Sequence, residues 1–539
     1  MSQNLNVGWK LHLNNKEDWI DARVPGNVHL DNLENRKIPD PFFGQNEAEM
    51  QWISDEDWTY KLMFEPDKDL MERKNIILFF HGLDTYADIF LNNIKVLSAN
   101  NMFHPWAADV KDVIKDGMNN LEIHFRSPLK EVSGQMNSID HALPADNDQA
   151  GKTSPYTRKA PYHYGWDWGP CLVTSGIWKE VELIGWEDWY VDQFHIKNKN
   201  VSKDIAELEV ELTVLSDISE GISVCVRESL SGKDFKKIFR MEPGVNDLSF
   251  TISIDNPDLW WPVGHGDQIL HEFFLTIETK EREEHHERRL GIRDVKIRRD
   301  KDEKGESFEI HVNGMPIYSK GANWIPADYF VERLTRDDYK RLLNDAIRAN
   351  MNTLRIWGGG IYEPDHFYEL CDEKGLLVWQ DFMFSCSTYP ATEKFLKSVE
   401  KEVSYQVKRL RDHPCIALWC GNNENLGALN WFDVSRENRD RYLVDYDRLT
   451  EGVIGKVVDA CDPSRSYWPS SPSGGRGDYS DNWHDDSRGD MHYWEVWHSG
   501  KSFDEICLGI SLIVSKFLVI SSPSFPLPLD RPFTNLPFL

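Results

Sequence analysis

A glutamate that directly follows two asparagines is the part of this sequence best suited to chemistry. Glu424 comes after Asn422 and Asn423, near the end of a stretch that begins at Trp419. A carboxylic acid in an aromatic pocket that raises its pKa can protonate a leaving oxygen and then take a proton from water. A neutral amide beside it can donate a hydrogen bond to a hydroxyl group. A loop carboxylate that caps the next helix is the alternative interpretation.

Aromatic residues and glycines add to this picture. The chain contains 21 tryptophans, and indole rings suit the apolar C–H faces of sugars. Trp357 precedes three glycines and is predicted to form the floor of a pocket, because glycine lets the backbone approach a ligand closely. Trp468 and residues 492–494 fall at the ends of candidate later strands, where they either line the pocket or pack in the core.

These residues need a scaffold in which strands and helices alternate. The hydrophobic pattern beyond residue 298 predicts helices at 337–349, 363–374 and 393–411, and strands at 351–357, 376–380 and 416–420. Such alternation indicates an α/β unit. Glu424 then falls just past the C-terminal end of a strand, which is the end that carries the chemistry in a (β/α)8 barrel.

Two blocks of strands are predicted before this unit. Short strands with turn residues between them, at 58–64, 75–80, 87–91 and 121–125, predict a β-sandwich over about residues 8–187, with Asn92 and Asn93 in a hairpin turn. Strict alternation at 206–214, with further strands at 222–226 and 273–277, predicts a second sandwich of immunoglobulin-like size over about 188–297.

Charge and composition exclude several classes of function. A formal net charge of −28 disfavours binding to nucleic acids and to anionic membranes. Residues 1–9 have neither a basic start nor an apolar core, so no secretory signal and a cytoplasmic location are predicted. The eight cysteines show no metal-ligand spacing and are interpreted as reduced structural thiols. No metal or other cofactor is expected.

Seven short sequence motifs, taken in order, resemble those of glycoside hydrolase family 2, and most of all those of its β-mannosidases. Each string alone is weak evidence, but their number and order are specific, and the likeness spans roughly residues 8–505. The strings lie at 24–29, 165–170, 176–179, 320–324, 355–360, 379–384 and 419–425.

The resemblance implies a multidomain fold. Residues 1–187 would form a jelly-roll sugar-binding-type β-sandwich and residues 188–297 an immunoglobulin-like β-sandwich. Residues 298–505 would form the catalytic (β/α)8 TIM barrel, here incomplete, and residues 506–539 an atypical apolar and Pro-rich tail.

The resemblance also implies an activity and its residues. The family member would be an exo-acting, retaining hydrolase of terminal β-D-mannose, with a β-mannoside oligosaccharide or glycan as substrate. Glu424 would be the acid/base and Asn423 would contact the sugar beside the scissile bond. Asp167, between Trp166 and Trp168, would accept hydrogen bonds from mannose hydroxyls, although this string also suits an aromatic turn packed between domains. β-Galactosidase and β-glucuronidase specificities remain alternatives.

The second carboxyl group of a retaining site is not found at the expected place. Retaining enzymes need two carboxyl groups about 5 Å apart, and the resemblance implies a Ser-Glu-Phe/Tyr-Gly motif about a hundred residues after the acid/base. No glutamate follows Glu505, and only Lys516, Asp530 and Arg531 are charged beyond it. We therefore predict that this chain has little hydrolase activity, that its tail is translated out of frame or from an unspliced segment, and that a non-catalytic sugar-binding fragment is the alternative function.

Overall fold

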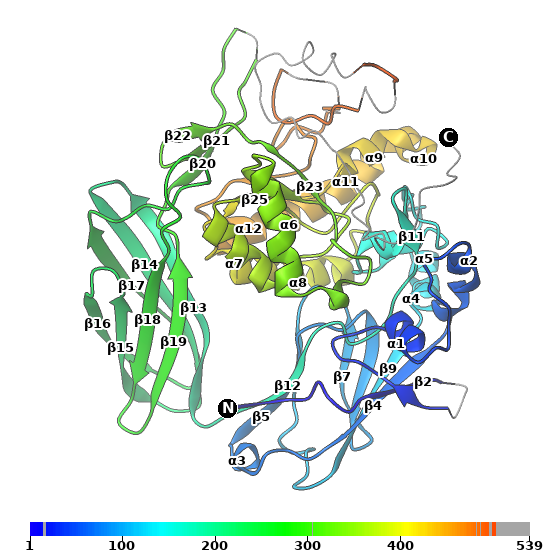
Figure 1. Cartoon of the computed structure of the whole chain (residues 1–539), viewed down its shortest axis with the longest axis horizontal. Helices are drawn as coiled ribbons and strands as arrows, with labels where there is room; N and C mark the ends of the chain where they lie inside the picture. Colours follow the sequence, from blue (N-terminus) through cyan, green and yellow to red (C-terminus); the bar gives the residue numbers. More distant parts are fainter. Residues whose placement is uncertain are drawn as a thin grey trace.

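The computed structural model describes residues 1–14, 18–303, 305–480, 482, 483, 485, 487–494 and 499–502. Three blocks follow one another along the chain: a β-sandwich drawn in blue to cyan, a second β-sandwich in teal to green, and an α/β unit in green to orange (Figure 1). The tail interpreted at 506–539 lies outside the described residues, as do Asp504 and Glu505.

The first sandwich packs a six-stranded sheet, in the order β3-β2-β4-β9-β6-β7, with a four-stranded sheet in the order β1-β12-β5-β8. Every second residue of β9 is buried, as expected for a strand with one face on the core. The strands are β1 Ser2–Asn4, β2 Lys10–Leu13, β3 Ile20–Asp21, β4 Trp58–Phe64, β5 Asn75–Phe80, β6 Tyr86–Leu91, β7 Ile94–Asn100, β8 Trp106–Asp109, β9 Asn119–Arg126 and β12 Val181–Trp186.

Short elements fill the connections of this sandwich. The predicted hairpin is confirmed, because Asn92 and Asn93 join β6 to β7 with φ of 53° and 68°. A second hairpin, β10 Tyr164–Trp166 with β11 Gly169–Cys171, carries the Trp166–Trp168 string. The helices are α1 Val28–Glu34, α2 Asn46–Glu49, α3 Lys68–Met71, α4 Pro128–Glu131 and α5 Ser133–Ser138.

The second sandwich consists of a sheet β13-β14-β17 and a sheet β16-β15-β18-β19, around a core of its own. The predicted strand at 206–214 is confirmed within β14, whose apolar residues are buried at every second position. The strands are β13 Trp189–Val201, β14 Ile205–Ser216, β15 Glu220–Glu228, β16 Asp234–Met241, β17 Gly244–Asp255, β18 His271–Glu278 and β19 Glu283–Leu290.

A small antiparallel sheet connects the second sandwich to the α/β unit. It is formed by β20 Val295–Arg298, β21 Glu309–Val312 and β22 Met315–Ile317. The domain boundary predicted between residues 297 and 298 therefore falls inside a strand. With only four residues, this strand was too short to give a clear signal in the sequence.

The α/β unit contains five parallel strands in the order β23-β24-β25-β26-β27. The predicted helices and strands between 337 and 420 are all confirmed, with β26 matching to the residue. Among the described residues, no helix is long and apolar enough to cross a bilayer. The elements are β23 Gly321–Trp324, α6 Arg336–Arg348, β24 Thr353–Ile356, α7 Asp365–Lys374, β25 Leu377–Asp381, α8 Glu393–Leu410, β26 Ile416–Cys420, α9 Asn425–Trp431, α10 Asp433–Glu437, α11 Arg439–Leu449, α12 Lys456–Cys461 and β27 Tyr467–Trp468.

A buried ion pair fixes the first sandwich to the α/β unit. Arg158 donates to both carboxylate oxygens of Glu402 on α8, with N–O distances of 2.8 and 2.7 Å. Glu402 also accepts hydrogen bonds from Asn101 at 3.0 Å and from Tyr362 at 3.0 Å. Four donors to one buried carboxylate make this contact rigid, so the hairpin that carries Trp166 and Trp168 keeps a fixed position over the parallel sheet.

Candidate active site

Glu424 stands at a sharp turn between β26 and α9. It occupies the N-cap position of α9 in the left-handed region, with φ of 62°, and its side chain makes no capping hydrogen bond. Asn422 caps the turn instead, because its Oδ1 accepts from the N–H of Asn425 at 3.0 Å. The helix-cap interpretation of Glu424 is therefore wrong. A non-glycine residue in this conformation is uncommon, and such strain is often found at functional sites.

The carboxyl group of Glu424 is held on both oxygens. Nδ1 of His492 lies 2.5 Å from Oε1, and the thiol of Cys386 donates to Oε2 at 3.2 Å. Glu424 is only 8% exposed, so these contacts replace water around the carboxylate. Cys386, in the connection between β25 and α8, has a φ of 48°, which makes it a second strained residue in contact with this carboxyl group.

The charge state of Glu424 corrects a prediction made from the sequence. Burial alone would raise the pKa of Glu424, but His492, Cys386 and Arg355 together outweigh burial and hold the pKa below the ordinary glutamate value. The raised pKa expected for an acid in an aromatic pocket is thus wrong for this structure. The cause is a set of specific partners, which together stabilise the carboxylate more than the loss of water destabilises it.

His492 is itself fixed by two residues. Its Nε2 lies 2.9 Å from Oγ of Ser471, and the same hydroxyl donates to Oδ2 of Asp490 at 2.6 Å. All three residues are at most 6% exposed. The sequence left open whether residues 492–494 line the pocket or pack in the core. The structure places His492 in direct contact with Glu424.

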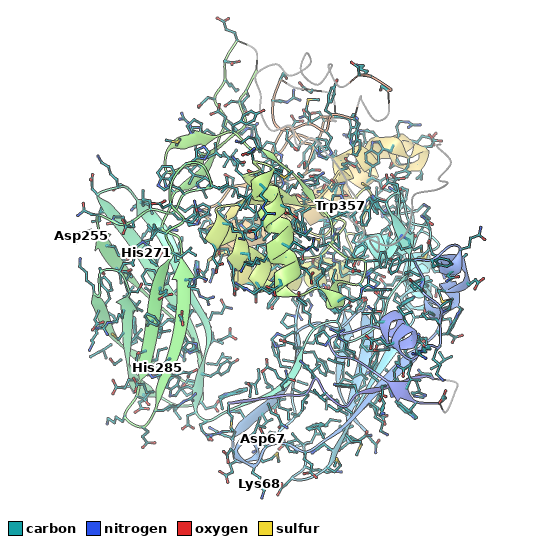
Figure 2. The ribbon with its side chains drawn as sticks, in the orientation of Figure 1. Asp67, Lys68, Asp255, His271, His285 and Trp357 are labelled. Atoms are coloured by element: carbon teal, nitrogen blue, oxygen red, sulfur yellow. The ribbon has the colours of Figure 1, made fainter. Side chains whose placement is uncertain are left out.

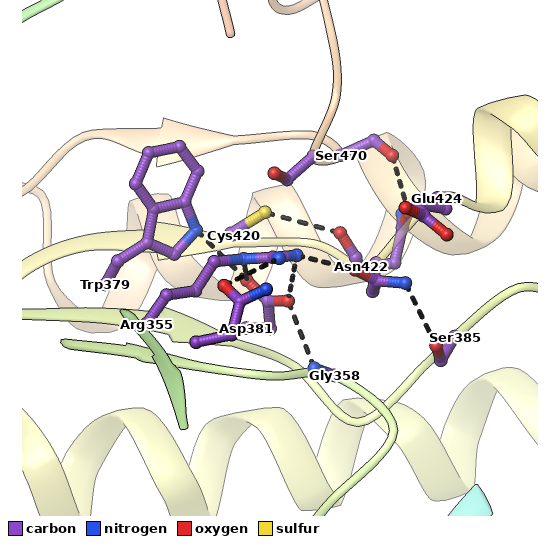
Figure 3. Close-up of polar contacts among 12 residues, drawn as sticks. Arg355, Gly358, Trp379, Asp381, Ser385, Cys420, Asn422, Glu424 and Ser470 are labelled. Carbon is purple, nitrogen blue, oxygen red and sulfur yellow. Dashed lines mark hydrogen bonds and ion pairs between the residues drawn. The ribbon is translucent and has the colours of Figure 1, made fainter. Parts of the chain in front are cut away.

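Asn423 is held by a buried cation. Arg355 of β24 donates to Oδ1 of Asn423 at 2.9 Å. Arg355 also forms an ion pair with Asp381 of β25 at 2.7 Å (Figure 3). Asp381 also accepts from the N–H of Gly358 at 3.1 Å. The Nδ2 group of Asn423 contacts Oγ of Ser385 at 3.2 Å. This network fixes the amide of Asn423 in one orientation. A group that recognises a sugar hydroxyl has to be held in a fixed orientation of this kind.

Three tryptophans from two domains meet beside this network. The ring centroid of Trp357 lies 4.7 Å from that of Trp166 and 5.7 Å from that of Trp168, both in edge-to-face geometry. Asp167 is exposed at the tip of the β10–β11 hairpin between them. Figure 2 labels Trp357 within the α/β unit. The structure thus brings together four of the residues singled out from the sequence.

The glycines after Trp357 make room for protein atoms. A Cβ atom at Gly358 would lie 2.5 Å from the carbonyl oxygen of Phe384 and 3.2 Å from the backbone nitrogen of Asn423. A Cβ atom at Gly359 would lie 1.9 Å from the ring of Trp357. Gly358 therefore lets the Trp357 turn pack directly against the turn that carries Asn423 and Glu424, and Gly359 leaves room for the Trp357 ring.

Trp468 lies behind the site. Its ring centroid is 4.4 Å from that of Phe308, it is 3% exposed, and its Nε1 donates to Oδ1 of Asp490 at 2.7 Å. Trp468 therefore supports the Asp490 carboxylate from the core, and its contact with a sugar stays a prediction. Among the described residues, no group of three or more His, Cys, Asp or Glu side chains could hold a metal ion.

A large cavity of about 1240 Å³ lies elsewhere, between the second sandwich and α8. Some of the charged groups on its wall pair with one another, as in His195 with Asp412 and His413 with Asp372. Glu424 is not part of its lining. Because the candidate acid/base lies outside it, we place the chemistry at Glu424 and not in this cavity.

Comparisons with known proteins identify the two β-sandwiches. Residues 9–179 match the family described as "Glycosyl hydrolase 2 galactose-binding domain-like", and residues 189–293 match "Glycosyl hydrolases family 2". The chain belongs to glycoside hydrolase family 2. The two matched regions are the two β-sandwiches that come before the unit carrying Glu424.

Individual relatives of this family 2 chain have β-mannosidase names. Beta-mannosidase B of Emericella nidulans is 35% identical over 92% of this chain and 59% of its own length. Beta-mannosidase of Mus musculus is 35% identical over 92% of this chain and 58% of its own length. The crystal structure of beta-D-mannosidase from Dictyoglomus thermophilum is 39% identical, with a TM-score of 0.87, over 94% of this chain and 61% of that one. The chain thus spans about three fifths of the length of these relatives.

Sequence reasoning missed several members of the site. Cys386 and Asp490 follow no hydrophobic period and were not singled out, and Arg355 and Asp381 were named only as parts of matching strings. A signal was present for the last two, since a charged residue inside an apolar strand is buried only with a partner. Cys386 carried no such signal.

Proposed function

We propose that this chain forms the acid/base part of an exo-acting, retaining β-mannosidase that removes terminal non-reducing β-D-mannose. The observation that carries the proposal is the buried carboxyl group of Glu424 at the C-terminal end of β26, aligned by His492 and Cys386. β-Mannosidase relatives at 33 to 39% identity favour mannose as the sugar. A β-mannoside oligosaccharide or glycan is the proposed substrate.

The sugar would lie between the tryptophan cluster and Glu424. Asp167 at the hairpin tip would accept hydrogen bonds from hydroxyl groups, and Trp166, Trp168 and Trp357 would cover the C–H face of the ring. Asn423, fixed by Arg355, would donate to the hydroxyl next to the scissile bond. A pocket closed on one side by another domain suits a terminal sugar, because no further sugar can pass beyond it.

The five parallel strands would be the first five of a (β/α)8 barrel, and the first sandwich would be a jelly roll. In a barrel of this kind the active site is assembled at the C-terminal ends of several strands. Glu424 after β26 and the glycine turn after β24 both lie at such ends. The remaining strands would bring the second carboxyl group of a retaining site.

For these 539 residues alone we infer slow or absent hydrolysis. The partners that the described residues give Glu424 are His492 and Cys386, and neither is a carboxylate that can act as nucleophile. The lowered pKa of Glu424 also leaves little of the protonated acid at neutral pH. A sugar-binding role without catalysis is therefore the second candidate for this chain by itself.

Hydrolysis of an aryl β-mannoside by the purified chain tests the proposal. Glu424→Ala is the test variant, and Glu437→Ala, exposed on α10, is the matched control. We expect tryptophan fluorescence to respond to methyl β-mannoside in the wild type, with turnover near background. Turnover that Glu424→Ala abolishes would show that a carboxylate outside the described residues completes the site. Faster turnover of the β-galactoside or β-glucuronide would contradict the mannose assignment.

A further inference from the structure

An unbroken line of hydrogen bonds connects Glu424 to a second buried carboxylate. Oε1 of Glu424 lies 2.5 Å from Nδ1 of His492, and Nε2 of His492 lies 2.9 Å from Oγ of Ser471. Oγ of Ser471 lies 2.6 Å from Oδ2 of Asp490. The four residues are 8%, 6%, 1% and 3% exposed, respectively. A line of this kind, shielded from water and ending in carboxylates, can hold one mobile proton.

At the Asp490 end of this hydrogen-bond chain, other donors hold one carboxylate oxygen and leave the second oxygen facing Ser471. Oδ1 of Asp490 accepts from Nε1 of Trp468 at 2.7 Å and from the N–H of Ser473 at 2.9 Å. Oδ2 therefore turns toward Ser471. Burial raises the pKa of Asp490 above the ordinary aspartate value, although His492 and these donors oppose the shift. Asp490 can thus take a proton at a pH at which an exposed aspartate cannot.

We propose that Asp490, Ser471 and His492 form a proton relay that loads and unloads the acid/base Glu424. This inference rests on the proposed function of Glu424. The three residues are positioning residues, because they act on the reaction through Glu424 and do not touch the substrate. The relay would place its mobile proton on Glu424 before Glu424 protonates the leaving oxygen, and would take back the proton that Glu424 later removes from water.

The proton count of the relay balances in each state. In one state of the proposed relay Glu424 and Asp490 are carboxylates, both nitrogens of His492 carry protons, and the Ser471 hydroxyl donates to Asp490. Loading breaks the Nδ1–H bond, whose electron pair stays on Nδ1, and forms an O–H bond on Oε1 of Glu424. The opposite transfer moves the Nε2 proton to Ser471 as the Ser471 proton moves to Asp490. Each of the three states holds the same number of protons.

The surroundings favour exchange along this line. Cys386 holds the other oxygen of Glu424, so the carboxyl group cannot rotate away from His492. Arg355 lowers the pKa of both Glu424 and Asp490 by its positive charge, and thus acts on both ends in the same direction. The ring of Trp483 lies 5.9 Å from that of His492 and packs against it.

The titration of Glu424 tests the relay on the full chain without any need for turnover. The chain is labelled with ¹³C at the side-chain carboxyl carbon of glutamate, and the Glu424 signal is identified by its loss in Glu424→Gln. We expect a midpoint below that of ordinary glutamate. His492→Gln, which removes the charge, should raise the midpoint by about one to three pH units. His271→Gln, which breaks a buried histidine–glutamate pair of 2.9 Å in the second sandwich, is the matched control and should leave it unchanged.

Two further variants separate a relay from a simple hydrogen bond. Asn at 492 keeps a donor near the Nδ1 position without the charge, so His492→Asn should also raise the midpoint if His492 acts by exchanging a proton. Asp490→Asn removes a like charge and should lower the midpoint, and this effect should shrink in the double variant with Ser471→Ala, because part of the coupling passes through the hydroxyl. A wild-type midpoint in His492→Asn, or an Asp490→Asn effect that survives Ser471→Ala in full, would overturn the relay. Absence of mannoside binding alone would contradict the proposed function and leave these midpoints unchanged.

Discussion

Removal of the Glu402 carboxylate should loosen the first sandwich from the α/β unit. Glu402 is fully buried and accepts four hydrogen bonds, two of them from Arg158. Glu402→Ala would leave the Arg158 guanidinium buried without its counter-ion. Breaking a buried pair by removing one partner costs about 3 to 5 kcal/mol, and this pair carries additional donors that would also lose their acceptor.

Urea unfolding followed by tryptophan fluorescence measures this loss. The matched control is Glu393→Ala on the same helix, whose exposed pair with Lys397 lies at 2.6 Å and should contribute nothing measurable. Because a chain of several domains need not unfold in one step, the comparison uses the first transition of each variant. We expect that transition to move to lower urea in Glu402→Ala alone, together with a weaker fluorescence response to methyl β-mannoside.

A double variant decides whether the charge pair is the cause. Arg158→Met combined with Glu402→Leu removes both charges and refills the space with apolar atoms, a change that is often neutral or stabilising. It should therefore recover most of the stability that Glu402→Ala loses. A loss below about 1 kcal/mol in Glu402→Ala, which is the range of surface pairs, would refute the reasoning, and so would a double variant as unstable as the single one.

Two further predictions concern the tryptophan cluster and a buried acid. Trp357→Ala should cost about 3 to 5 kcal/mol of unfolding free energy and abolish the fluorescence response to methyl β-mannoside; unchanged sugar binding would contradict the proposed pocket. Burial raises the pKa of Glu363 to about 7, although Tyr339 and Trp324 donate to it. Because folding raises the pKa of Glu363, the free energy of unfolding is highest below about pH 4.5. It falls by about 3 kcal/mol as the pH rises to 7. Glu363→Gln should remove that fall in urea unfolding at pH 5 and pH 8, and an equally steep fall in the variant would contradict it.

The parts of the fold that could be predicted are those whose signals lie within a few neighbouring residues of the sequence. The strand at 416–420 was predicted to the residue because an apolar run there ends at a glycine. The helix over 336–348 begins with a capping box at Thr335 and Asp338, a signal confined to four residues. By contrast, β20 has only four residues of mixed polarity, and short strands of that kind give no reliable period.

The partners of the candidate acid/base could not be predicted in the same way. His492 is 68 residues from Glu424 in the chain, and Cys386 is 38 residues away. Their contacts depend on how the ends of neighbouring strands come together in the fold. The local hydrophobic pattern of the sequence does not contain that information. The direction of the Glu424 pKa was mispredicted for the same reason, because an aromatic setting was considered without the histidine that faces it.

The balance at Glu424 gives the second carboxylate of a retaining site two functions on the proposed mechanism. Burial raises the pKa of Glu424, whereas His492, Cys386 and Arg355 lower it, and in this structure the lowering prevails. A negative charge about 5 Å away, at an effective dielectric constant near 20, disfavours the ionised form by about 3 kcal/mol, or roughly two pKa units. That is comparable with the effect of one ion pair, so a single carboxylate can transfer the proton from His492 to Glu424. The nucleophile would thus also create the acid, and Glu424 would become protonated only in a site that is ready to react.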